Sequence, residues 1–122
     1  MLGPNFTNKA QEAIAKAQRL AQQKGQQQVD ALHLLLALLD QEGTILDVLF
    51  SKLGVDKENL KDRTEQAIHL IPRIIGVSRT SGQLYLTQDL ARVLDQAKDE
   101  MSKMGDEFIA VEHLFLALLI VP

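Results

Sequence analysis

Apolar residues recur every three or four positions through most of this chain, which is the period of an amphipathic helix. We expect six helices, over residues 8–24, 31–41, 45–53, 57–71, 88–104 and 111–120. The first and fifth each carry one apolar stripe, and the stripe of the first is rich in alanine, which lets neighbouring helices approach closely. The second and sixth are apolar around nearly their whole circumference, as is typical of helices at the centre of a core.

The chain contains an internal repeat, because residues 6–39 align without a gap with residues 86–119. The identical pairs include Thr7 with Thr87, Gly25 with Gly105 and His33 with His113. Each threonine precedes a helix, where its hydroxyl can accept a hydrogen bond from an unpaired amide of the first turn. Each glycine follows a helix, where a left-handed conformation is favoured. Each repeat therefore predicts a capped helix, a glycine stop, a short link and a second, more apolar helix.

These elements organise the chain as one all-α domain of two related halves. Repeat one covers about residues 6–71, a connector covers residues 72–86, and a partial repeat two covers residues 87–122. Repeat two lacks a counterpart of the third and fourth helices, so we expect its last helix to leave apolar surface uncovered. For that reason we expect the sequence to be a fragment of a longer protein.

Composition and charge exclude several classes of protein. The 122 residues are 46% apolar and only 4% aromatic, which favours packed helices over a β-sandwich. The net charge of −3, with acids and bases interspersed, provides no basic face for nucleic acid. Because the longest apolar runs fall well short of about 20 residues, no membrane span is expected. The absence of cysteine excludes disulfides and is compatible with the cytoplasm, where we expect the protein to be.

The sequence holds no recognisable catalytic or cofactor motif. It lacks a Gly-Lys-Ser or Gly-Lys-Thr phosphate loop, a His-Glu-x-x-His helix and a Gly-x-Ser-x-Gly elbow. His33, His69 and His113 could hold a metal ion, but metal sites usually show further ligands at readable spacing. We expect instead that His33 and His113 each hydrogen-bond a nearby backbone or cap group. The chain is therefore predicted to be non-catalytic, with no catalytic, cofactor-binding or metal-binding residues.

Three further patterns have structural interpretations. Asp106 and Glu112 lie near a helix start, where acids interact favourably with the helix dipole, and a carboxylate there could also orient a peptide amine or guanidinium. Met101 and Met104, at helical spacing, are expected in the core. The glutamine-rich residues 22–28 are expected to face solvent.

Four segments of the two repeats have recognisable motifs, namely residues 6–13 (FTNKAQEA), 32–43 (LHLLLALLDQEG), 85–94 (YLTQDLARVL) and 105–114 (GDEFIAVEHL). All four resemble the N-terminal domain of the Clp/Hsp100 protein-unfolding machines. The likeness spans about residues 6–119. Within the family, the step Leu32-His33 and residues 70–73 are most similar to the ClpB disaggregase type.

The resemblance implies two pseudo-symmetric four-helix repeats that are flexibly tethered ahead of AAA+ ATPase rings, which form a hexamer in the parent protein. ATP and magnesium would bind in those rings, outside this chain. The implied function is capture of exposed segments of unfolded or aggregated polypeptides, with no role for nucleic acid or membrane. The family's polar substrate-binding positions fall on Thr7, Asp106 and Glu112. Its apolar groove positions fall on Gln96, Glu100 and His113, where leucine would be expected.

Two other functions stay open at this point. The first is docking of adaptor proteins or phosphoarginine-tagged peptides on a Clp-protease unfoldase, which the resemblance links to a glutamate before the histidine. Only the second repeat has this step, as Glu112-His113, whereas Leu32 precedes His33. The second is a stand-alone helical oligomerisation or scaffold protein, an interpretation that gains weight only if the chain ends at Pro122.

Overall fold

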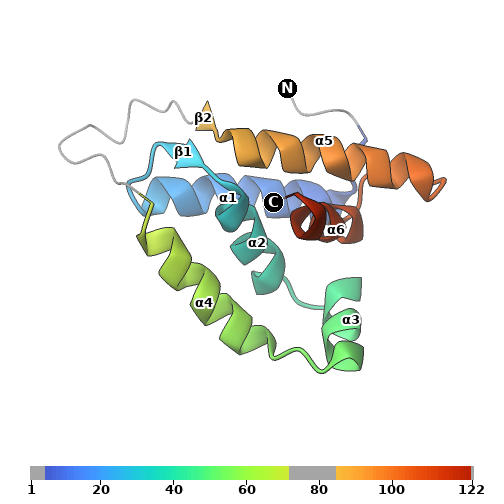
Figure 1. The fold of residues 1–122 in the computed structure, drawn as a ribbon, viewed down its shortest axis with the longest axis horizontal. Coiled ribbons are helices and arrows are strands. Elements are labelled where there is room, and N and C mark those ends of the chain that lie inside the picture. Colours follow the sequence, from blue (N-terminus) through green and yellow to red (C-terminus); the bar gives the residue numbers. More distant parts are fainter. Residues whose placement is uncertain (1–4, 72–84, 122) are drawn as a thin grey trace.

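The computed structural model describes residues 5–71 and 85–121, arranged as Figure 1 shows. The elements are α1 (Asn8–Gln23), β1 (Gln28–Val29), α2 (Ala31–Asp40), α3 (Ile45–Leu53), α4 (Lys57–His69), β2 (Tyr85–Leu86), α5 (Gln88–Lys103) and α6 (Val111–Ile120). All six predicted helices are confirmed, and their ends move by at most two residues. The predicted connector lies outside the described residues, except for β2. None of the described helices combines the length and the apolar character needed to cross a membrane.

The predicted caps form at both ends of the helices. The hydroxyl oxygens of Thr7 and Thr87 each accept from the amide three residues later, at 3.2 and 3.1 Å. After α1 and α5, Gly25 and Gly105 adopt φ angles of 70° and 73°, a left-handed conformation in which a Cβ atom would be strained. The side chains of Asp30, Thr44 and Asp56 cap α2, α3 and α4 in the same way.

In each repeat, the segment before the first helix pairs with the link between the helices of the other repeat. The sequence analysis did not predict this pairing. β1, in the link before α2, pairs in parallel with β2, which precedes α5. The equivalent bridge joins Phe6, which precedes α1, to Ile109 in the link before α6. The amide of Thr87 donates to Val29 O and the amide of Thr7 donates to Ile109 O, both at 3.0 Å. Each repeat therefore satisfies backbone groups in the link of the other.

The helices α2 and α6 form the centre of the core, as their all-round apolar composition predicts. α1 and α4 pack on α2, α5 packs on α6, and α2 contacts α6. The alanine stripe of α1 is buried, with Ala10, Ala13, Ala17 and Ala21 at most 1% exposed. Small side chains on this stripe let α1 lie close to α2. The all-α fold class is therefore confirmed.

The two central helices differ in how much of their apolar surface is covered. Leu39 is 0% exposed at the end of α2, which packs against α1, α4 and α6. Leu119 holds the equivalent position on α6 and is 68% exposed. Among the described residues, α6 has no counterpart of α4. The predicted uncovered apolar surface on the sixth helix is therefore confirmed.

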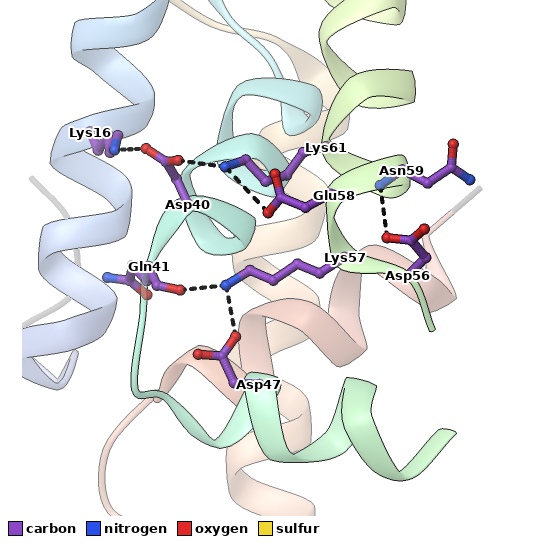
Figure 2. A network of polar contacts seen from close by, with 9 residues as sticks. All are labelled: Lys16, Asp40, Gln41, Asp47, Asp56, Lys57, Glu58, Asn59 and Lys61. Carbon is purple, nitrogen blue, oxygen red and sulfur yellow. Dashed lines mark hydrogen bonds and ion pairs between the residues drawn. The ribbon is translucent and has the colours of Figure 1, made fainter. Parts of the chain in front are cut away.

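Charged side chains fasten α1, α3 and α4 to the end of α2, as Figure 2 shows. The Asp40 carboxylate pairs with Lys16 of α1 and lies 3.0 Å from Nζ of Lys61 of α4. These two lysines hold the pKa of Asp40 below its ordinary value. Lys57 of α4 donates to Asp47 of α3 at 2.7 Å and to the carbonyl that follows α2 at 2.9 Å.

Two sequence predictions about exposure each fail at one residue, whereas Gln22, Gln23 and Gln28 are exposed as predicted. Gln26, in the glutamine-rich stretch, is only 3% exposed, because its amide donates to the carbonyls of Ile68 and Ile71 at the end of α4. Met104 is 55% exposed, because α5 ends before it and it forms the C-cap. Met101, one turn earlier, packs against the core as predicted.

Candidate functional site

The candidate site lies where the start of α1 meets the link between α5 and α6. The amide of Thr7 donates to Ile109 O at 3.0 Å, and the amide of Ile109 donates to Asn5 O at 2.6 Å. This pairing holds Thr7 beside the link, which contains Asp106 and leads into the first turn of α6 with Glu112. The three predicted polar positions therefore lie on two segments that pair with each other at one junction between the repeats.

The Thr7 hydroxyl keeps a proton available at this junction. Its oxygen accepts from Ala10 N at 3.2 Å, and no acceptor for its proton is found in residues 5–71 and 85–121. In the other repeat, the hydroxyl of Thr87 donates to Oδ1 of Asp30 at 2.8 Å. The position equivalent to Asp30 is Ala110, whose side chain has no polar atom. Thr7 can therefore donate to a ligand where Thr87 cannot.

The Asp106 carboxylate is partly exposed and is hydrogen-bonded by a buried histidine. Its side chain is 49% exposed, and its Oδ2 lies 2.9 Å from Nε2 of His113, which is only 1% exposed. Nδ1 of His113 accepts from the backbone amide of Ala110 at 2.8 Å. His33 accepts in the same way from the amide of Asp30 at 2.9 Å. The predicted hydrogen bonds of both histidines to cap groups are therefore confirmed.

The three predicted groove positions do not share one environment. The Gln96 amide donates to Oε2 of Glu100 at 2.7 Å along α5, and Nζ of Lys103 lies 3.3 Å from the same oxygen. Glu100 is 8% exposed and His113 is 1% exposed, whereas Gln96 is half-buried. A ligand on the surface could therefore reach the Gln96 side chain, whereas the side chains of Glu100 and His113 are buried.

Exposed apolar side chains lie within two residues of Asp106 in the chain, and the sequence analysis did not predict their exposure. Phe108, in the same link, is 51% exposed, and Met104 is 55% exposed. A signal was available, because Phe108 is one of only four phenylalanines and lies in a link instead of on an apolar helix stripe. A large exposed apolar group is informative when it adjoins polar groups that can orient a ligand.

The equivalent surface of the first repeat is closed by the protein's own groups. Gln26, at the position of Asp106, is buried against α4. Asp30 accepts from the amide of Leu32 at 3.1 Å as well as from the threonine hydroxyl. Leu32 itself stands where the second repeat has Glu112. The two repeats therefore share a backbone arrangement, but the second presents a half-exposed carboxylate where the first has a buried amide.

Comparison with known proteins places this arrangement in a family. The sequence profile described as the Clp repeat (R) N-terminal domain matches residues 5–121. The chain belongs to this family. This Clp repeat domain is 42% identical over 112 residues to the chaperone protein ClpB of Bacillus cereus, and 43% identical over 115 residues to the chaperone protein ClpB 2 of Nostoc. These matches cover 92% and 93% of the chain but only 13% of each relative.

Solved structures share the fold of the Clp repeat domain. The N-terminal domain of Hsp104 from Candida albicans superposes with a TM-score of 0.84 at 23% identity, covering 96% of this chain and 75% of that one. The N-terminal domain (1–163) of the ClpV1 ATPase from E. coli gives 0.82 at 27% identity, covering 93% and 67%. The predicted family and fold are therefore confirmed, and the chain covers only this N-terminal domain of its relatives.

Proposed function

We propose that this Clp repeat domain is the substrate-recognition module of an ATP-dependent chaperone of the disaggregase type, and that it binds exposed segments of unfolded or aggregated polypeptides. The observation that carries the proposal is the junction of Thr7, Asp106 and Phe108. It combines an available hydroxyl donor, a half-exposed carboxylate and an exposed aromatic ring. An unfolded segment offers carbonyls, amides and apolar side chains, which match these three groups.

Weak binding suits this role. A module tethered to its parent protein meets a nearby substrate repeatedly at high effective concentration, and weak contacts release the segment to the next step. The domain itself supplies recognition, while ATP and magnesium act in hexameric AAA+ rings elsewhere in the parent chain. The matched relatives are named chaperones, and this chain spans 13% of their length, which accords with an accessory role.

The test is an amide NMR titration of the labelled domain with β-casein, a permanently unfolded protein. We expect shifts centred on Thr7, Asp106 and Glu112, with folded ubiquitin as a titrant that causes none. Asp106→Ala should weaken the affinity roughly three- to tenfold, as expected for one lost hydrogen bond. Asp62→Ala, on the exposed face of α4, is the control and should leave the affinity unchanged. A spectrum that stays silent up to about millimolar casein would overturn the proposal.

Docking of adaptors or phosphoarginine-tagged peptides is a second candidate, favoured by one observation. Ala110, the N-cap of α6, offers no side-chain acceptor, so no side chain of the described residues caps the first-turn amides of α6, and Ile109 just before it pairs with Thr7. A phosphoryl group can accept from such amides, and a guanidinium can pair with Glu112. Free phosphoarginine should then shift the amides of residues 110–112, an effect lost in Glu112→Ala and not caused by arginine. A spectrum that phosphoarginine does not change would rule out this second function and leave only the first one.

A further inference from the structure

Two buried histidines use one hydrogen-bond pattern in the two repeats. His33 and His113 are each the third residue of a central helix, and Nδ1 of each accepts from the backbone amide of the N-cap residue, at 2.9 and 2.8 Å. An imidazole nitrogen that accepts carries no proton, so in the neutral ring the proton lies on Nε2. Both rings are therefore held as donors towards the residue seven positions earlier.

The acceptors at that earlier position differ between the repeats. In repeat one, Nε2 of His33 lies 2.6 Å from Oε1 of Gln26, whose amide donates onward to two carbonyls at the end of α4. Gln26 is 3% exposed, so this chain of hydrogen bonds ends inside the protein. In repeat two, Nε2 of His113 lies 2.9 Å from Oδ2 of Asp106, whose side chain is 49% exposed. In repeat two, the chain of hydrogen bonds therefore ends at the surface.

We propose that His113 is a positioning residue, which holds the Asp106 carboxylate in the orientation that contacts an unfolded segment. This inference rests on the proposed function, because it takes Asp106 as a substrate-contacting group. The ring occupies Oδ2, and Oδ1 has no partner in the described part of the chain, so that oxygen is left for an amide or cation of the ligand. A carboxylate already fixed in one rotamer loses less conformational entropy when the ligand binds.

Three variants test this role, and one of them is a matched control in the other repeat. His113→Leu removes both hydrogen bonds of the ring, and His33→Leu removes the equivalent pair in repeat one. His113→Gln is the conservative rescue, because a side-chain amide can accept from the N-cap amide and donate to Asp106 with its other atom. Both leucine variants should lower stability, so any effect on substrate affinity that only the His113 variant shows belongs to the site.

The first readout is casein affinity of the 122-residue chain. We expect His113→Leu to weaken it roughly three- to tenfold, as for one lost hydrogen bond, and His113→Gln to restore it to within about twofold. His33→Leu should leave it unchanged. In an Asp106→Ala background, His113→Leu should have no further effect, because the two residues act as one unit. If Asp106→Ala weakens binding and His113→Leu does not, the positioning role is wrong.

The second readout is independent of binding. Three-bond NMR couplings report the χ1 angle of Asp106, and we expect a single rotamer in the unmodified chain, averaging in His113→Leu and a single rotamer again in His113→Gln. An averaged χ1 in the unmodified chain, or a fixed one in His113→Leu, would overturn the inference. A chain that binds no casein but shows the expected χ1 pattern would refute the proposed function while leaving His113 as the group that orders Asp106.

Discussion

The hydroxyl of Thr87 donates a hydrogen bond of 2.8 Å to Oδ1 of Asp30, a residue of the other repeat. Asp30 also accepts from the amide of Leu32 at 3.1 Å, so one carboxylate both caps α2 and fastens the start of α5 to it. Ala110 occupies the equivalent place in the second repeat. Its methyl side chain can accept neither from an amide of α6 nor from the hydroxyl of Thr7. Together with the exchange of Gln26 for Asp106, this difference in side chain leaves the second junction open.

Ala110→Ser should stabilise the domain by restoring the missing cap. Ala110 has φ −104° and ψ 175°, nearly the same as the φ −104° and ψ 166° of Asp30, so a serine can cap α6 without a change in the backbone. We expect the free energy of unfolding to rise by about 0.5–1 kcal/mol. Urea unfolding followed by circular dichroism measures it, with Ala110→Val as the control that should give no gain. Equal stability of the serine and alanine forms would contradict the prediction.

Leu39→Ala and Leu119→Ala should differ strongly although the two leucines are equivalent in the repeat. Leu39 is 0% exposed, so its truncation leaves a cavity between α2 and its neighbours and should cost about 2–4 kcal/mol. Leu119 is 68% exposed, so its truncation should change the free energy of unfolding by no more than about 0.5 kcal/mol. Urea unfolding of both variants in parallel checks this, and similar costs would show that the C-terminal end of α6 is covered in solution.

The stability of the domain should fall as the pH drops below neutrality, partly through His33. Burial lowers the pKa of His33 below its ordinary value of 6.5, against an opposing effect of the Asp30 carboxylate. The unfolded chain therefore binds a proton on this residue more readily than the folded chain. Its contribution is fully present above about pH 6.5 and is lost as the pH falls from there towards the lower folded pKa.

His33→Gln provides the control for this pH dependence, because glutamine can form both hydrogen bonds of the ring but does not titrate there. Unfolding free energies measured from about pH 7.5 to about pH 5 at constant salt should decline less in the variant than in the unmodified chain. An unchanged decline would mean that other groups, and not His33, cause the loss of stability.

Asp40→Asn should destabilise the domain modestly and in a salt-dependent way. The carboxylate pairs with Lys16 and Lys61 and so connects α1, α2 and α4, as Figure 2 shows. Because the Asp40 side chain is 36% exposed, solvent screens both pairs, and we expect a loss of about 0.5–1 kcal/mol at low salt that shrinks at high salt. Thermal unfolding at two salt concentrations measures it. Asp62→Asn, which takes part in no ion pair found among the described residues, should have no such effect.

Much of the candidate site could be predicted from the sequence, because the resemblance pointed to Thr7, Asp106 and Glu112 and the structure brings them to one junction. The exposure of Phe108 could not be predicted, since an apolar residue in a short link is buried or exposed according to the elements that surround it. Nor could the bond between His113 and Asp106 be predicted, because it depends on how the link folds back over the first turn of α6.

The six helices, their caps and the relation between the two halves could be predicted from the amino-acid sequence. These features are local: Thr7 caps the helix that it precedes, and Gly25 ends the same helix through its own φ angle, whatever packs against it. Which polar groups are buried, and which repeat stays open, depends instead on tertiary contacts. Gln26 is buried by the end of α4, and Thr87 is bonded to a carboxylate 57 residues away. Contacts between segments so distant in the chain leave no periodic pattern in the sequence, because they depend on how the helices pack together and not on the neighbouring residues.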